Sequence, residues 1–215
     1  MNVLLIGNGG REAALAWKLA QSPLLTRLFV SGENPGWPVG TVCRPASNVD
    51  EIVTVARENQ VALVVVGPEA PLADGVADAL VAVGIPVFGP QRAAAALESS
   101  KVFAKNVMRK VGIPTAGALV VTLDDPQSVQ AGKARLALGS VVIKADGLAA
   151  GKGVFVCPTA EQAEAAFEEV TNGRFGSAAE TLLLEDLLTG PEVSIFALSD
   201  GERVVALPSA TDHKR

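Results

Sequence analysis

The first hundred residues alternate short apolar runs, rich in β-branched side chains, with longer amphipathic segments. The apolar runs predict strands at Asn2–Ile6, Arg27–Val30, Val61–Val66 and Pro86–Phe88. They are apolar almost without interruption, which is typical of parallel strands covered on both faces. The intervening segments predict helices, most clearly at Val49–Asn59, which Asn48 can cap. The pattern therefore predicts a doubly wound α/β domain built from βαβ units.

The pattern changes after Gly89–Pro90. The expected elements are helices at Ala93–Leu97 and Lys101–Val111, a strand at Ala118–Val121, a helix at Pro126–Leu138, a strand at Val141–Lys144, a glycine loop at Asp146–Gly153, a strand at Val154–Cys157, a helix at Thr159–Thr171 and a strand at Thr181–Glu185. This order predicts a domain boundary near residue 100, followed by a small α+β lobe.

The last part of the chain predicts a β-hairpin. Its strands are expected at Glu192–Leu198 and Arg203–Leu207, joined through Asp200–Gly201, because Asp-Gly readily supplies the positive φ of a tight turn. Thr211–Arg215 then follows with neither a closing helix nor a cap. We therefore expect the sequence to be part of a longer protein.

Composition narrows the classes of function. A net charge of -5 argues against binding to a nucleic-acid backbone or an anionic membrane, although one pocket can still be locally basic. The start lacks the basic region of a signal peptide, and no apolar run approaches the ~20 residues of a membrane-spanning helix, so a cytoplasmic protein is expected. Cys43 and Cys157 lack the spacing of a zinc site and are expected to be reduced thiols.

Gly7-Asn8-Gly9-Gly10-Arg11 lies between the first strand and the first helix. Unpaired N–H groups at a helix start favour an anion, and the adjacent arginine favours a phosphate. The motif differs from the dinucleotide fingerprint GxGxxG, because Glu12 stands at the third glycine position. A tight βα turn without a ligand remains an alternative.

Gly67-Pro68-Glu69 follows the third expected strand. Open α/β sheets bind ligands beyond the carboxyl ends of their strands, so Glu69 is a candidate substrate contact. A turn acid without a ligand is an equal alternative.

The strongest feature is Lys144 at the end of an apolar strand, followed by a loop that contains Gly147, Gly151 and Gly153. Glycines let backbone amides approach phosphate oxygens, and a lysine supplies positive charge. A Walker A loop would need Ser or Thr after Lys152, where this chain has Gly153. The stretch therefore predicts a nucleotide-phosphate loop outside the Walker A class.

Other charged residues are candidates of lower specificity. Among the basic residues of the helix expected at 101–111, Lys105 is singled out, and the others are expected to form a solvated face. Glu185 and Glu192 flank a crossover between two strands, where carboxylates and backbone groups can hold a base and a ribose. Each glutamate is equally compatible with a turn or strand-end acid.

Six segments, taken in order, resemble one family. They are GNGGRE at 7–12, GPEAPL at 67–72, SKVFAK at 100–105, IKADGLAAGKGV at 143–154, LLEDLLTGPEVS at 183–194 and DHKR at 212–215. This order resembles the glycinamide ribonucleotide synthetase family of ATP-grasp ligases along the whole chain. The resemblance implies an N-terminal pre-ATP-grasp domain followed by the first part of an ATP-grasp fold.

The resemblance also implies a domain division and roles for individual residues. Residues 1–100 would form the substrate domain, 124–188 the ATP lid, and 101–123 with 189–215 the start of the catalytic lobe. The nucleotide would be held by Lys105, Lys144, Gly151, Lys152, Gly153, Glu185, Leu187, Leu188 and Glu192. Phosphoribosylamine would contact Gly9, Gly10, Arg11, Pro68 and Glu69. Asp212, Lys214 and Arg215 would join Lys144 near the transferred phosphate.

The implied reaction joins glycine to phosphoribosylamine with ATP, through glycyl phosphate, in purine biosynthesis. Mg²⁺ or Mn²⁺ would assist, with ligands expected beyond Arg215 and none within this chain, and the chain alone would turn over poorly. The sequence departs from the family at Ala13, where a histidine is usual, in the 31–37 loop, and at Thr211, where a glutamine is usual. The alternatives are another ATP-grasp ligase or carboxylase, and a non-catalytic dinucleotide-binding module. The oligomeric state is open.

Overall fold

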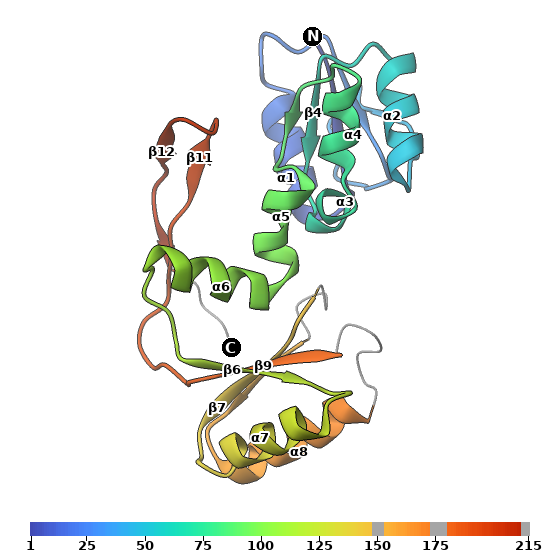
Figure 1. The fold of residues 1–215 in the computed structure, drawn as a ribbon. Helices are drawn as coiled ribbons and strands as arrows, with labels where there is room; N and C mark the ends of the chain where they lie inside the picture. The colour runs from blue at the N-terminus through green and yellow to red at the C-terminus, as the bar shows by residue number, and fades with distance from the viewer. Residues whose placement is uncertain (148–152, 173–179, 212–215) are drawn as a thin grey trace.

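The computed structural model describes residues 1–147, 153–172 and 180–211 (Figure 1). The first lobe contains a parallel five-stranded sheet in the order β3-β2-β1-β4-β5. The strands are β1 (Asn2–Ile6), β2 (Arg27–Val30), β3 (Val42–Cys43), β4 (Leu63–Val66) and β5 (Val87–Phe88). The predicted strands are confirmed, with shorter β4 and β5, and the two-residue β3 was not expected from the sequence.

Helices cover both faces of this sheet. They are α1 (Gly10–Leu19), α2 (Val49–Glu58), α3 (Glu69–Ala73), α4 (Val76–Ala82) and α5 (Arg92–Ser99). Along β1, Leu4 and Ile6 join the core beneath α2 and α4, whereas Val3 and Leu5 join the core beneath α1. Asn48 caps α2 as predicted, accepting a hydrogen bond from the backbone N–H of Glu51. The doubly wound prediction is confirmed.

A second lobe contains an antiparallel sheet in the order β6-β9-β7-β8. The strands are β6 (Ala118–Thr122), β7 (Val141–Ala145), β8 (Val154–Cys157) and β9 (Thr181–Glu185). Helices α7 (Pro126–Leu136) and α8 (Ala160–Thr171) pack on one face of the sheet (Figure 1). The apolar core between them includes Ile143, Phe167 and Leu184. This is the predicted α+β lobe.

Helix α6 (Lys101–Val111) lies on the opposite side of this sheet from α7 and α8 (Figure 1). Ser100 ends α5 and caps α6, and its hydroxyl accepts a hydrogen bond from the backbone N–H of Phe103. Gly112 ends α6 with a φ of 75°, in the left-handed region that favours glycine. The helix therefore begins and ends as its sequence predicts.

The final segment differs from the expected hairpin. The first expected strand is split into β10 (Val193–Ser194) and β11 (Ala197–Ser199). β11 pairs with β12 (Val204–Ala206), but β10 pairs with β13 (Ala210–Thr211). Gly201 has the expected positive φ of 96°, and the carboxylate of Asp200 accepts hydrogen bonds from the backbone N–H groups of Glu202 and Arg203. The turn was predicted correctly; the length of the first strand was not.

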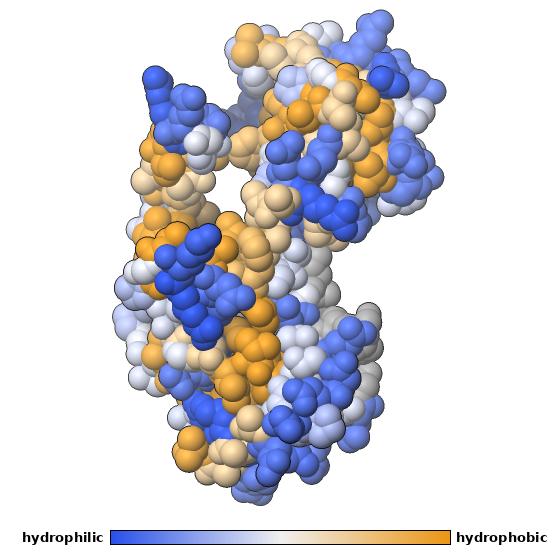
Figure 2. All heavy atoms as spheres, in the orientation of Figure 1, coloured by the Kyte–Doolittle hydropathy of each residue, from blue (hydrophilic) through white to orange (hydrophobic). Residues whose placement is uncertain are grey.

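Apolar side chains on the hairpin are exposed. Figure 2 shows its hydrophilic tip above an apolar stem, and Val204 and Val205 are 70% and 60% exposed.

Within the described ranges, no helix is long and apolar enough to cross a membrane. The domain limits near residues 100, 123 and 188 stay a prediction.

Candidate functional site

Strand alternation brings Lys144 and Glu185 to one face of the second sheet. Val141, Ile143 and Ala145 of β7 point into the core under α7 and α8, so Lys144 points to the other face, toward α6. In β9, Leu182 and Leu184 enter the same core, and Glu185 therefore shares the face of Lys144. Because Val142 pairs with Glu185 in the antiparallel register, Lys144 and Glu185 are diagonal neighbours.

The carboxylate of Glu185 lies between two ammonium groups. Lys144 Nζ is 2.6 Å from Glu185 Oε2, and Lys105 Nζ is 3.3 Å from Glu185 Oε1. Lys105 extends from α6 and is only 4% exposed. Its Nζ also donates hydrogen bonds to Thr115 Oγ1 at 2.6 Å and to the carbonyl oxygen of Ala116 at 2.8 Å.

This cluster carries two positive charges and one negative charge, with its carboxylate and one lysine buried. A net positive, largely desolvated site suits a polyanion, because opposite charges attract more strongly where water is excluded. Lys144 is the more accessible lysine, with 28% of its side chain exposed. An incoming phosphate could therefore approach Lys144 first.

The base of the glycine loop adjoins this cluster. The backbone N–H of Ala145 donates to the carbonyl oxygen of Gly153 at 2.8 Å, which brings the two ends of the loop together. Gly153 is buried. Two further predicted contacts, Gly151 and Lys152, lie outside the described residues.

The chain after β9 contains the remaining predicted nucleotide contacts. Leu187 is half-buried, whereas Leu188 and Glu192 are exposed. The neighbouring Asp186 forms an ion pair at 2.8 Å with Arg135. Asp212, Lys214 and Arg215 lie outside the described residues, so the structure brings together Lys105, Lys144 and Glu185 and leaves the other proposed roles as predictions.

A second candidate site lies where the order of the parallel sheet reverses, between β1 and β4. The GNGGR loop follows β1 and Gly67-Pro68-Glu69 follows β4, at the position where open α/β sheets bind ligands. Arg11 Nη2 is 3.6 Å from Glu69 Oε2. A pocket of about 170 Å³ is lined there by Arg11, Gly67, Glu69, Leu72, Pro90, Ala95 and Glu98.

Glu12 is a member of this second site that sequence reasoning missed. Although only 4% exposed, it accepts hydrogen bonds from the backbone N–H of Gly9 at 2.7 Å and from Arg11 Nε at 2.9 Å. The bond with Glu12 is the main reason that the pKa of Arg11 is raised. A carboxylate three residues after a helix N-cap often bonds back to it, and this spacing was the available signal.

The contacts of Glu12 also explain the glycines around it. A Cβ at Gly7 would lie 2.8 Å from Glu12 Cγ, and a Cβ at Gly67 would collide with Glu12 Oε1. The buried carboxylate of Glu12 therefore fills the space that side chains at positions 7 and 67 would need. Asn34 completes the loop by donating to the carbonyl oxygens of Asn8 and Gly9 at 2.7 and 3.2 Å.

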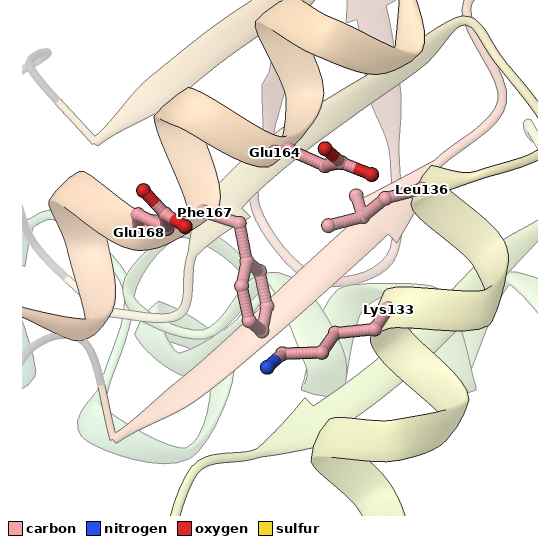
Figure 3. A pocket seen from close by; sticks show the side chains of 5 residues that line it. All are labelled: Lys133, Leu136, Glu164, Phe167 and Glu168. Carbon is pink, nitrogen blue, oxygen red and sulfur yellow. The ribbon is translucent and has the colours of Figure 1, made fainter.

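Two other pockets contain neither lysine of the candidate nucleotide site. One, of about 560 Å³, lies between the ends of the parallel strands and the hairpin, and its lining contains no lysine or arginine. The lining residues are Val66, Leu72, Val87, Phe88, Gly89, Pro90, Ala197, Leu198, Ser199 and Asp200. The other lies between α7 and α8, where Figure 3 shows Lys133 facing Phe167 with Glu164 and Glu168 nearby. Neither pocket is lined by Lys105, Lys144 or Glu185.

Comparison with known proteins identifies the family. Residues 1–98 match the N domain of phosphoribosylglycinamide synthetase, and residues 99–215 match its ATP-grasp (A) domain. The chain belongs to the phosphoribosylglycinamide synthetase family. ATP-grasp enzymes use ATP and a divalent metal, and the two candidate sites fall one in each matched domain of the synthetase.

Individual relatives agree with the phosphoribosylglycinamide synthetase assignment. The chain is 47% identical over 221 residues to phosphoribosylamine–glycine ligase of Rhodopirellula baltica, covering 99% of this chain and 50% of the relative. It is also 47% identical to the ligase of Nostoc sp., covering 100% of this chain and 51% of the relative. The chain thus spans about half the length of the curated relatives it matches.

Solved structures show the same fold. The phosphoribosylamine–glycine ligase of Thermotoga maritima superimposes with a TM-score of 0.75 at 28% identity, covering 97% of this chain and 49% of that one. D-alanyl-alanine synthetase A of Vibrio cholerae gives a TM-score of 0.70 at 19% identity, covering 98% and 66%. The predicted combination of a doubly wound domain and the first part of an ATP-grasp fold is therefore confirmed.

Proposed function

We propose that this chain takes part in the ATP-dependent ligation of glycine to 5-phosphoribosylamine, giving glycinamide ribonucleotide, ADP and phosphate. Membership of the phosphoribosylglycinamide synthetase family and the names of its relatives support this reaction. The observation that carries the proposal is the convergence of Lys105 and Lys144 on Glu185 beside a glycine loop.

In this proposal, Lys105 and Lys144 bind ATP phosphates. Each ammonium group in contact with a phosphate oxygen contributes ~4 kcal/mol of attraction at an effective dielectric of 20. In the loop between β7 and β8, Gly151, Lys152 and Gly153 would present backbone N–H groups to the same oxygens. Glu185 and the backbone of Leu187 and Leu188 would hold adenine, and Glu192 the ribose hydroxyls.

Phosphoribosylamine would occupy the pocket at the switch point of the parallel sheet. The proposed contacts are Gly9, Gly10, Arg11, Pro68 and Glu69. Of these, Arg11 and Glu69 line the pocket, and Arg11 would supply the positive charge. Two side chains hold the GNGGR loop in shape. Glu12 accepts a hydrogen bond from the backbone N–H of Gly9, and Asn34 donates to the carbonyl oxygens of Asn8 and Gly9. This pocket would position the amine of the substrate.

The proposed reaction has two balanced steps. A carboxylate oxygen of glycine attacks the γ-phosphorus of ATP, the bond to the bridging oxygen breaks, and ADP leaves. The amine nitrogen of phosphoribosylamine then attacks the carbonyl carbon of glycyl phosphate, phosphate leaves with the bonding electrons, and the nitrogen loses a proton. Asp212, Lys214 and Arg215 would lie near the transferred phosphate together with Lys144.

We propose Mg²⁺ as the metal, with Mn²⁺ as a substitute, because hard cations neutralise the charge of ATP phosphates. Over residues 1–147, 153–172 and 180–211, no group of three or more acidic, histidine or cysteine side chains could hold a metal ion. The described residues do not fit a protein-held metal, so we assign it no ligands among them. We further propose a cytoplasmic location for this small-molecule reaction.

The test is glycine-dependent release of ADP from Mg–ATP in the presence of phosphoribosylamine. It should be run on residues 1–215 and on the full product of the gene. ADP release by the full product that requires both substrates would support the proposal. Release that requires bicarbonate in place of glycine would contradict it and indicate an ATP-grasp carboxylase.

A dinucleotide-binding module is the second hypothesis, and a titration with reduced nicotinamide dinucleotide, followed by fluorescence, tests it separately. Binding of that dinucleotide without any binding of Mg–ATP would contradict the ligase proposal and support the dinucleotide-binding module. The buried carboxylate of Glu12 beside Gly7, Gly9 and Gly67 favours the ligase.

A further inference from the structure

Asp146 connects the end of β7 to the beginning of α6. Its Oδ2 accepts a hydrogen bond from Ser100 Oγ at 3.0 Å, and its Oδ1 accepts one from the backbone N–H of Val102, also at 3.0 Å. The next residue, Gly147, accepts a hydrogen bond at its carbonyl oxygen from Lys101 Nζ at 3.0 Å. Three residues at the start of α6 are therefore bonded to two residues that follow β7.

This connection satisfies a requirement of the helix. The first N–H groups of an α-helix have no partner within the helix. Ser100 Oγ accepts from the N–H of Phe103, and Asp146 accepts from that of Val102. A carboxylate is also stabilised by the partial positive charge at a helix N-terminus. The backbone N–H of Asp146 donates to the carbonyl oxygen of Thr181 at 2.8 Å, which holds Asp146 to the start of β9.

The connection lies beside both lysines of the candidate nucleotide site. Lys144 precedes Asp146 by two residues at the end of β7. Lys105 follows Lys101 by four residues on α6, so both side chains extend from one face of that helix. The contact of Asp146 with α6 consequently sets how Lys105 and Lys144 are placed relative to each other.

Glu185 also joins the two lysines, but its ion pairs involve the ammonium groups that a phosphate would draw on. The bonds of Asp146 to Ser100 and Val102 use neither ammonium group. A ligand can therefore weaken the ion pairs of Glu185 and leave the contact of Asp146 with α6 intact.

We propose that Asp146 is a positioning residue of the nucleotide site, which aligns Lys144 with Lys105 by bonding the end of β7 to the N-terminus of α6. The inference rests on the proposed function, because it requires that the two lysines bind nucleotide phosphates. Asp146 itself needs no contact with the nucleotide.

The first test is a calorimetric titration of the protein and its Asp146→Ala variant with Mg–ATP. We expect the variant to bind about tenfold more weakly, because one lysine is no longer aligned with the other. Asp125→Ala is the matched control, since Asp125 caps α7 by accepting from the N–H of Gln127 at 2.9 Å, away from both lysines. Equal affinities for the Asp146 and Asp125 variants would overturn the inference.

A double-mutant cycle separates positioning from general stabilisation. If Asp146 acts through Lys144, Asp146→Ala should cost less than threefold in affinity when Lys144 is already alanine. The same tenfold loss in both backgrounds would show a role independent of Lys144 and would contradict the inference. Asp146→Asn should recover most of the affinity, because its amide oxygen can still accept from the N–H of Val102.

Ser100→Ala provides a second route if Asp146→Ala fails to fold. It removes the hydroxyl that donates to Asp146, and Thr159→Ala removes an equivalent cap from α8. At least threefold weaker binding in the Ser100 variant than in the Thr159 variant supports the inference, and equal binding overturns it. Absence of Mg–ATP binding by the unaltered protein would instead refute the proposed function.

Discussion

Lys144 Nζ lies 2.6 Å from Glu185 Oε2, and the two residues come from neighbouring antiparallel strands. The other oxygen of the same carboxylate is 3.3 Å from Lys105 Nζ. Glu185 thus separates two positive charges that would otherwise repel each other in a partly desolvated site. A nucleotide phosphate would provide the same neutralisation from outside.

Lys144→Ala should weaken binding of Mg–ATP by at least about tenfold, equivalent to about 1.4 kcal/mol. The reason is the loss of an ammonium group held beside the glycine loop. Lys110→Ala is the control, because Lys110 is an exposed residue in the last turn of α6. Titration calorimetry measures both variants, and equal losses of affinity would rule out the assigned role of Lys144.

Glu185→Gln should lower the free energy of unfolding by about 3 kcal/mol, because it leaves the buried Lys105 ammonium without its counter-charge. The neighbouring substitution Asp186→Asn should cost less than about 1 kcal/mol, since Asp186 is in an exposed ion pair with Arg135. Urea unfolding compares the two variants. Similar destabilisation by both would show that the Glu185 cluster is not effectively buried.

Gly67→Ala should destabilise the first lobe by about 1–3 kcal/mol, because the added methyl group collides with the buried carboxylate of Glu12. Gly10→Ala is the matched control: apart from its chain neighbours and the backbone of its own helix, no atom lies within 4 Å of the added Cβ. We expect it to be neutral or slightly stabilising. Thermal unfolding of the two variants decides, and a harmless Gly67→Ala would contradict the packing of Glu12.

The hairpin turn should lose stability at acid pH. Hydrogen bonds from the backbone N–H groups of Arg203 and Glu202 lower the pKa of Asp200 in the folded state. A depressed folded pKa means that the stabilisation is present above the unfolded pKa, near 3.9, and is lost as pH falls through the lower folded value. An NMR titration of the Asp200 carboxyl carbon measures this pKa. A midpoint at or above 3.9 would disprove the carboxylate–turn contacts.

Much of the architecture was predictable because local pattern determines it. Apolar runs predicted β1 and β2, and the capping residue Asn48 predicted the start of α2. The exceptions were short or non-local: β3 has two residues, and β10 pairs with β13 rather than continuing into the hairpin. Strand pairing depends on contacts between distant segments, which a local pattern does not contain.

The candidate site shows the same division. The sequence by itself determined that Lys144 ends a buried strand beside a glycine loop, and that Glu12 occupies a fingerprint glycine position. Only the tertiary structure decided that Lys105 and Lys144 share Glu185, that Glu12 is buried against Gly67, and that Asp146 bonds to the start of α6. Lys101, expected on a solvated face, is half-buried and donates to the carbonyl oxygen of Gly147, whereas Arg109 is exposed as expected and donates to the carbonyl oxygen of Ala118. The physical reason is that residue type and spacing fix which chemical groups a segment presents, whereas packing of sheet, helix and loop fixes which of those groups meet.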